Sequence, residues 1–148
     1  MMKIRTLLYV LISTFFVSSA FAQPNLITIS PRQITSVYDG DTFRAYLPGI
    51  TPQDKQSTRI RIRHIDTPEI KGQCVYEKDL AAKARGYGME LLTGSRSITL
   101  SQLGRDRYGR LLATVTLNGN ISYANKMLSA GLARPYEGGR RNSWCHAK

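Results

Sequence analysis

The sequence is poor in the residues that zinc sites require. It has two cysteines and two histidines among 148 residues, so it cannot form an array of zinc fingers, and a single zinc site is not expected. Repeats and low-complexity segments are also lacking. After residue 22, no stretch approaches the roughly 18–20 apolar residues that a membrane-spanning helix needs. Hydrophobic residues make up 42% and charged residues 21%, which predicts one ordinary globular domain.

Acidic residues are scarce: 10 Asp and Glu stand against 21 Lys and Arg, a net charge of +11. A surplus of this size predicts a polyanionic partner: nucleic acid, an anionic membrane surface or an acidic polysaccharide. Most of the basic residues are arginines. Because the planar guanidinium grips phosphate through two hydrogen bonds, nucleic acid is the favoured partner.

The first residues, Met1–Ala22, have the pattern of a secretory signal peptide. Two basic residues precede the apolar stretch Leu7–Val17, and Ala20-Phe21-Ala22 matches the small-x-small cleavage pattern. The alternative is an uncleaved membrane anchor. We expect cleavage after Ala22 and a single domain, residues 23–148, in the periplasm or outside the cell.

Export also bears on the two cysteines, Cys74 and Cys145. An oxidising compartment favours a disulfide between them, and the alternative is two free thiols. The disulfide would join the C-terminal tail to the middle of the chain. Trp144, next to Cys145, is expected to pack on it, and Arg140-Arg141 to attract phosphate or to be solvated.

The pattern of apolar and polar residues predicts three strands, a helix, two strands and a second helix. Residues 23–31 are expected to form a loose arm, and the tail from 133 has no periodicity. An order of this kind is typical of a small five-stranded α+β barrel of the OB type, although other α+β folds share it. The expected elements are Gln33–Tyr38, Thr42–Leu47, Ser57–Ile65, the helix Tyr76–Leu92, Ser97–Leu100, Leu111–Leu117 and the helix Ile121–Ala130.

Four of the few acids lie in two short motifs, Asp39-Gly40-Asp41-Thr42 and Asp66-Thr67-Pro68-Glu69. Both follow expected strands, so the two turns can converge at one end of the barrel. Two carboxylates 4 Å apart repel by about 4 kcal/mol at an effective dielectric near 20, and a divalent cation would offset this. An all-oxygen set suits Ca²⁺ or Mg²⁺ rather than zinc.

Two arginines accompany these acids. Arg61 precedes Asp66 on the same expected strand, and Arg110 ends the basic turn Asp106-Arg107-Tyr108-Gly109-Arg110. A cation and arginines stabilise charge on a five-coordinate phosphorus, and a carboxylate accepts a proton from the attacking water. The combination indicates a phosphodiesterase.

The chain resembles the staphylococcal nuclease (thermonuclease) family. The matching stretches are Tyr38–Thr42, Arg61–Glu69, Asp106–Arg110 and Gly131–Ala133, in order and at similar spacing. The resemblance implies an OB-fold barrel and Ca²⁺-dependent cleavage of DNA and RNA, with little sequence preference and 3′-phosphate products. The residues themselves do not distinguish Ca²⁺ from Mg²⁺.

The resemblance also implies roles for single residues. Asp41 and Asp66 would bind Ca²⁺ through their carboxylates, and Thr67 through its backbone carbonyl. Glu69 would be the general base. A stable protein partner is not implied, and a monomer is expected.

Arg61 and Arg110 would bind the phosphate as catalytic residues. Arg107, Tyr108 and Tyr136 are candidate contacts to the nucleotide. Arg107 and Tyr108 lie in the basic turn, and Tyr136 lies near Gly131–Ala133, the motif that the family's stacking aromatics follow. His64 is expected to be a strand residue on the buried face rather than a catalytic acid.

One departure concerns the C-terminus. The third, C-terminal helix of the family's type member is not expected in this sequence, and the Cys74–Cys145 disulfide would substitute for its packing. The alternative function is a noncatalytic OB module that binds nucleic acid or polysaccharide; the presence of all five expected catalytic and ligand side chains argues against it.

Overall fold

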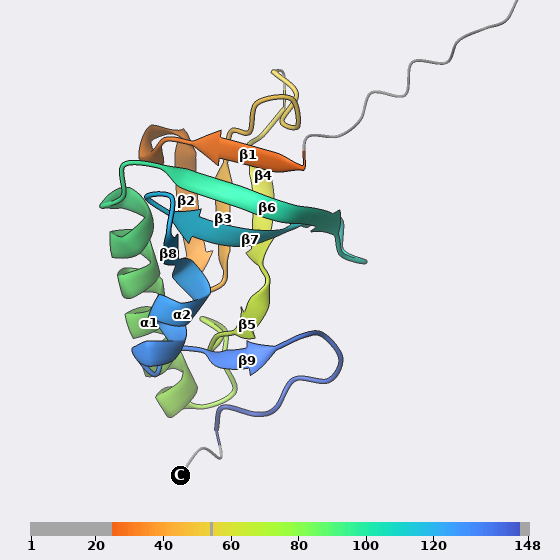
Figure 1. The fold of residues 1–148 in the computed structure, drawn as a ribbon. Coiled ribbons are helices and arrows are strands. Elements are labelled where there is room, and N and C mark those ends of the chain that lie inside the picture. Colours follow the sequence, from red (N-terminus) through yellow and green to blue (C-terminus); the bar gives the residue numbers. More distant parts are fainter. Residues whose placement is uncertain (1–24, 54, 146–148) are drawn as a thin grey trace, which may run out of the picture.

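The computed structural model describes residues 25–53 and 55–145, so the expected signal peptide lies outside the described residues. The described part contains nine strands and two α-helices (Figure 1). The helices are α1 (Val75–Thr93) and α2 (Tyr123–Ser129), and a short 3-10 helix covers Pro31–Gln33. The strands are β1 (Leu26–Ile29), β2 (Ile34–Asp39), β3 (Thr42–Ala45), β4 (Thr58–Ile62), β5 (His64–Asp66), β6 (Ile98–Arg105), β7 (Leu111–Leu117), β8 (Ile121–Ser122) and β9 (Arg134–Tyr136).

The main sheet curls into a half-barrel with the strand order β1-β6-β7-β4-β3-β2, and β8 pairs with β7. The β4–β7 pair is parallel and the other pairs are antiparallel. Strands β5 and β9 form a separate two-stranded sheet. Helix α1 packs against β2, and α2 packs against β7. This arrangement confirms the expected α+β fold of the OB type, with two α-helices and no third one in the described residues.

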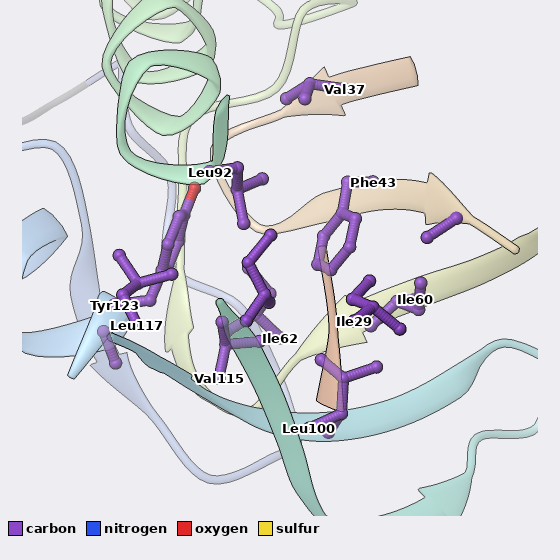
Figure 2. Close-up of a cluster of buried hydrophobic side chains, with 14 of the residues drawn as sticks. Ile29, Val37, Phe43, Ile60, Ile62, Leu92, Leu100, Val115, Leu117 and Tyr123 are labelled. Atoms are coloured by element: carbon purple, nitrogen blue, oxygen red, sulfur yellow. The ribbon is translucent and has the colours of Figure 1, made fainter. Parts of the chain in front are cut away.

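The core lies between the curled sheet and the two helices. Strand β7 shows how the sequence builds it, because Leu111, Ala113, Val115 and Leu117 are buried and the residues between them are half-buried. Each fully buried aliphatic side chain contributes about 1.5–3 kcal/mol. Side chains from the other strands and from α1 and α2 meet those of β7 (Figure 2), among them Ile29, Val37, Phe43, Ile60, Ile62, Leu92, Leu100 and Tyr123.

The five expected strands are present, but several boundaries were wrong. The expected loose arm contains β1, which pairs with β6 and buries Ile27 and Ile29. Strand β6 runs to Arg105 rather than ending at Leu100, and the first two residues of the expected second helix belong to β8. Strand β1 gains its structure from pairing with a strand far away in the sequence, and β8 and the end of β6 gain theirs from pairing with β7. A local pattern does not reveal such pairing.

The expected strand Ser57–Ile65 is broken. Arg63 separates β4 from β5, and His64 adopts a positive φ of 70°. The break redirects the chain from the main sheet to the pair that β5 makes with β9. His64 therefore does not share the buried face of Ile60 and Ile62; its half-exposed ring contacts Glu137, with Nδ1 2.9 Å from Oε1.

The most deeply buried residues of helix α1 differ in part from the expected ones, although Tyr87 and Leu91 of the expected face also pack against the core. Its buried residues include Ala81, Ala84, Gly88 and Leu92, whereas the periodicity favoured Leu80, Ala84, Tyr87 and Leu91. Of the latter, only Ala84 is fully buried. The reason is close packing at Gly88, where a Cβ atom would lie 2.3 Å from the hydroxyl of Tyr123.

Because of this close packing, substitution by alanine should have opposite effects on stability at the two glycines of α1, Gly86 and Gly88. A methyl group at Gly88 would collide with the Tyr123 hydroxyl, which donates a hydrogen bond of 2.7 Å to the Gly40 carbonyl. At Gly86 a Cβ would meet nothing within 4 Å. We expect Gly88→Ala to lower the free energy of unfolding by about 1–3 kcal/mol. Gly86→Ala is expected to raise it by about 1 kcal/mol, since alanine is the better helix former.

Urea unfolding of the two variants measures the difference. Adding Tyr123→Phe to Gly88→Ala removes the colliding oxygen and leaves the ring carbon 3.5 Å from the new Cβ. The pair should therefore be less destabilised than the two single effects added together. Equal behaviour of the Gly86 and Gly88 variants would contradict the packing argument.

Candidate active site

The turn between β2 and β3 presents two buried carboxylates, Asp39 and Asp41, which are 7% and 1% exposed. Gly40 between them is required by space, because a Cβ there would lie 2.8 Å from Cγ2 of Thr67. The hydroxyl of Tyr123 donates a hydrogen bond of 2.7 Å to the Gly40 carbonyl. The turn is therefore fixed by α2 and by the chain after β5 together.

Arg61 links this turn to the second acidic motif. Its NH2 atom lies 3.2 Å from Oδ2 of Asp41 and 3.9 Å from Oδ1 of Asp66. The backbone N–H of Thr67 donates to Oδ2 of Asp41 at 2.9 Å. All four residues are buried. The structure thus brings together all three predicted metal ligands and one of the two predicted phosphate-binding arginines.

The donor set fits a hard divalent cation. The hydroxyl oxygen Oγ1 of Thr67 is buried and has no hydrogen-bond partner among the described residues. Burial and the negative charge of Asp41 raise the pKa of Asp39 to about 7, which shows how costly a further negative charge is in this turn. Carboxylate, carbonyl and hydroxyl oxygens are ligands of Ca²⁺ and Mg²⁺. Asp41, Asp66 and Thr67 are the residues that would hold such an ion.

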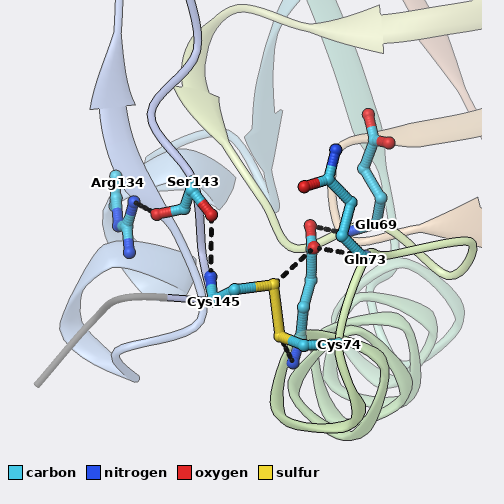
Figure 3. The surroundings of a disulfide bond; sticks show 7 residues. Glu69, Gln73, Cys74, Arg134, Ser143 and Cys145 are labelled. Atoms are coloured by element: carbon cyan, nitrogen blue, oxygen red, sulfur yellow. Dashed lines mark hydrogen bonds between the residues drawn. A yellow bond between two sulfur atoms is a disulfide. The ribbon is translucent and has the colours of Figure 1, made fainter.

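Glu69 lies beside this cluster, with half of its side chain exposed. Its backbone N–H donates to Oε1 of the buried Glu77 at 3.2 Å, and the N–H of Gln73 donates to Oε2 at 3.0 Å. Glu77 is in the first turn of α1, so the helix positions the loop that carries Glu69 (Figure 3). The carboxylate of Glu69 contacts NH1 of Arg141.

Arg141 bridges two acids. Its Nε donates to Oδ1 of Asp66 at 2.5 Å while NH1 contacts Glu69. Burial alone would lower the pKa of Arg141, but the charges of Asp66 and Glu69 outweigh it and raise that pKa. A tail residue that was expected to attract phosphate or to be solvated therefore belongs to the acidic cluster.

Arg110 is placed differently from Arg61. Its Nε donates to Oδ2 of Asp106 at 2.6 Å, and Asp106 also accepts from the backbone N–H groups of Tyr108 and Arg110. Burial would raise the pKa of Asp106, but these hydrogen bonds lower it. The guanidinium carbons of Arg107 and Arg110 lie 4.9 and 5.5 Å from the centre of the Tyr108 ring. The turn therefore forms a compact basic platform around an exposed aromatic ring.

Two adjoining hollows connect these groups. The larger one, of about 720 Å³, is lined by Arg61, Arg107, Tyr108, Arg110 and Tyr136. The smaller one, of about 280 Å³, is lined by Asp66, Glu69, Glu77 and Trp144. Residues 140 and 141 line both hollows. Arg61 and Arg110 therefore face one cavity without contacting each other, and the C-terminal tail separates it from Asp66 and Glu69.

Sequence comparisons place the chain among known proteins. Residues 59–146 match the family described as staphylococcal nuclease homologue. The chain belongs to this family. Two curated relatives, from Escherichia coli O157:H7 and Escherichia coli, are each named "Uncharacterized endonuclease". Each is 28% identical to this chain over 123 residues, which cover 79% of this chain and 68% of the relative. The protein is a nuclease, an enzyme that hydrolyses phosphodiester bonds.

The sequence analysis of this nuclease missed the roles of Glu77, Arg141 and Trp144. Trp144 is 6% exposed, and its Nε1 donates to Oδ2 of Asp66 at 3.2 Å. Glu77 could have been found as an acid three residues after a helix-capping Cys74, a position that commonly accepts backbone N–H groups. For Trp144 the only signal in the sequence was its position next to Cys145, and for Arg141 there was none.

The cysteines form a disulfide, as expected. Among the described residues, the ligand atoms of Cys74, Cys145 and Glu77 are the only group of three or more from His, Cys, Asp and Glu that lie within 4.8 Å of one another. This group is not a metal site, because the two sulfur atoms are bonded to each other. The carboxylates of Asp41, Asp66 and Glu69 do not form such a group within 4.8 Å of one another.

Proposed function

We propose that this nuclease is an exported, calcium-dependent enzyme that cleaves DNA and RNA with little sequence preference. The observation that carries the proposal is the buried cluster of Asp41, Arg61 and Asp66 at the edge of an arginine-lined cavity. The three carboxylates of Asp41, Asp66 and Glu69 outnumber the two arginines that contact them, Arg61 and Arg141. A hard cation would neutralise the remaining negative charge. Such a cation next to phosphate-binding arginines can stabilise the negative charge that develops on the phosphate during phosphodiester hydrolysis.

Each residue has a role in this proposal. Asp41, Asp66 and Thr67 hold Ca²⁺, which, when bound, polarises the phosphate and stabilises its developing charge. Glu69, half-exposed beside Asp66, accepts the proton of the attacking water. Arg61 donates hydrogen bonds to the phosphate oxygens as their charge increases.

The large cavity would hold the substrate strand. Arg110 and Arg107 bind phosphates, while Tyr108 and Tyr136 offer ring faces to a base or sugar. Tyr108 is 69% exposed, so its ring is available to a ligand. Aromatic faces and arginines accept any base, which accounts for the low sequence preference. The net charge of +11 makes binding electrostatic, and affinity should decrease with added salt.

The test is cleavage by the protein recovered after expression of all 148 residues. We expect plasmid DNA and a structured RNA both to be degraded with Ca²⁺ and to remain intact after chelation. A series with Ca²⁺, Mg²⁺ and Mn²⁺ decides the metal. Activity with Mg²⁺ and none with Ca²⁺ would reject the assignment of calcium. Cleavage that continues after chelation would reject the proposal that the enzyme needs a divalent cation.

The same preparation tests export. We expect the protein in the periplasm or medium to have the mass of a chain that starts at Gln23. A mass that retains residues 1–22 would contradict cleavage at this site.

A further inference from the structure

The only tryptophan of the chain lies in the C-terminal tail and yet reaches the active site. Trp144 is 6% exposed, and its indole N–H donates to Oδ2 of Asp66 at 3.2 Å. The indole has a single donor and no acceptor. Its hydrogen bond occupies Oδ2 of Asp66, whereas Oδ1 accepts from Arg141 of the same tail and lies 3.9 Å from Arg61.

Three contacts hold Trp144 in this place. The guanidinium of Arg134 stacks 3.7 Å from the centre of its ring and donates to the Ser143 carbonyl at 3.0 Å. Arg134 itself is paired with Asp66 in the register of β9 and β5. The third contact is covalent: Cys145, the next residue, is bonded to Cys74 at the start of α1.

The same disulfide lies against the loop of Glu69. The sulfur of Cys145 is 3.6 Å from Oε2 of Glu77, and the other oxygen of that carboxylate accepts the backbone N–H of Glu69 (Figure 3). The disulfide is therefore next to Trp144, which contacts the proposed metal ligand Asp66, and next to Glu77, which holds the loop of the proposed base Glu69.

We propose that Trp144 is a positioning residue of the nuclease site, and that the Cys74–Cys145 disulfide acts through it to orient the carboxylate of Asp66 for the cation. The inference rests on the proposed function, because it requires Asp66 to be a metal ligand. It makes Ca²⁺ binding dependent on the oxidation state of the disulfide. The enzyme is competent when the disulfide is formed and weakened when it is reduced.

The opposite possibility is that the tail is an inhibitory cap, since Arg141 contacts Asp66 and Glu69. The depth of Trp144 argues against it. A removable cap would rest on the surface, whereas Trp144 is buried and donates to Oδ2 of Asp66, the oxygen next to the one that Arg61 and Arg141 contact. Groups that hydrogen-bond a metal ligand in this manner typically change metal affinity by 10–100-fold when they are removed.

The first experiment measures Ca²⁺ binding by calorimetry on metal-free protein without substrate. Trp144→Phe keeps an aromatic ring against Arg134 but removes the N–H group. We expect its dissociation constant for Ca²⁺ to increase about 10–100-fold, with a nearly unchanged melting temperature. Ser143→Ala is the matched control, because it alters the neighbouring residue without removing a contact to Asp66, and it should bind Ca²⁺ as the wild type does.

The second experiment removes the disulfide. Dithiothreitol supplies two electrons and two protons, which convert the disulfide to two thiols while the reagent closes to its own cyclic disulfide. The double variant Cys74→Ser, Cys145→Ser gives the same state without the reagent. We expect a similar loss of Ca²⁺ affinity below the melting temperature, and a shift of the Trp144 fluorescence to longer wavelength as the indole becomes exposed.

Combining the changes shows whether they act through one another. If the disulfide works through Trp144, then adding Trp144→Phe to the cysteine variant causes little further loss of Ca²⁺ affinity. Additive losses, unchanged Ca²⁺ affinity in either variant, or higher nuclease activity after reduction would each overturn the inference. Failure of the proposed function is distinguishable, because then the wild type itself would bind no Ca²⁺.

Discussion

Replacing Glu69 by glutamine is expected to lower kcat for phosphodiester cleavage by about 10²–10⁴-fold, the usual contribution of a general base. The amide has nearly the shape of the carboxylate but cannot accept the proton of the attacking water. The cost to the fold should be small, within about 0.5 kcal/mol, because half of the side chain is exposed and its backbone N–H keeps its bond to Glu77.

The measurement is single-turnover cleavage of a short oligonucleotide at saturating Ca²⁺, together with binding of an uncleavable analogue. Binding should be nearly unchanged. Glu137→Gln is the matched control, since Glu137 also lines the large cavity but contacts His64 rather than Asp66. Because Glu69→Gln also alters the contact with Arg141, Arg141→Ala is measured beside it. Full activity in Glu69→Gln would remove the general-base assignment.

The parts of the fold that could be predicted from the sequence are those in which local chemistry and tertiary contacts agree. Strand β7 alternates strictly, and its predicted bounds, Leu111–Leu117, match the structure. The turn Asp39-Gly40-Asp41 separates two strands as expected, since Gly40 has the local signature of a turn. The close approach of Thr67, which leaves no space for a side chain at Gly40, comes from tertiary packing and could not be inferred from the sequence.

The parts that could not be predicted depend on distant partners. Strand β9 exists because it pairs with β5, and β1 because it pairs with β6. The buried face of α1 is set by the approach of Tyr123 to Gly88, which no periodicity contains. The tail was the largest omission, because Trp144 and Arg141 reach the site only after the disulfide and β9 have brought the chain back to it.

Arg61 is the buried positive charge that contacts both Asp41 and Asp66, whereas Arg141, which also contacts Asp66, is partly exposed. The guanidinium of Arg61 reaches Asp41 and Asp66, donates to the Ile62 carbonyl at 2.5 Å and lies 5.9 Å from the centre of the Tyr136 ring. It therefore contributes to stability and faces the substrate cavity at the same time. A residue with both roles should show two separable effects when it is replaced.

We expect Arg61→Gln to lower the free energy of unfolding by about 3–5 kcal/mol in metal-free protein, the usual cost of leaving a buried charge without its partner. Because Ca²⁺ binds the folded state only, adding it should restore part of that loss. Activity should stay about 10²–10³-fold low even with Ca²⁺, since the donor to the phosphate is missing.

Arg61→Lys separates charge from geometry. Lysine keeps the positive charge near Asp41 and should retain more stability than glutamine, but it lacks the planar fork, so its activity should remain low. Arg59→Gln, on the exposed face of the same strand, is the matched control for both readouts. Urea unfolding with and without Ca²⁺ and single-turnover cleavage measure the two effects. An Arg61→Gln protein as stable as the wild type without Ca²⁺ would show that Asp41 and Asp66 do not need this charge, and the case for a cation between them would lose its electrostatic basis.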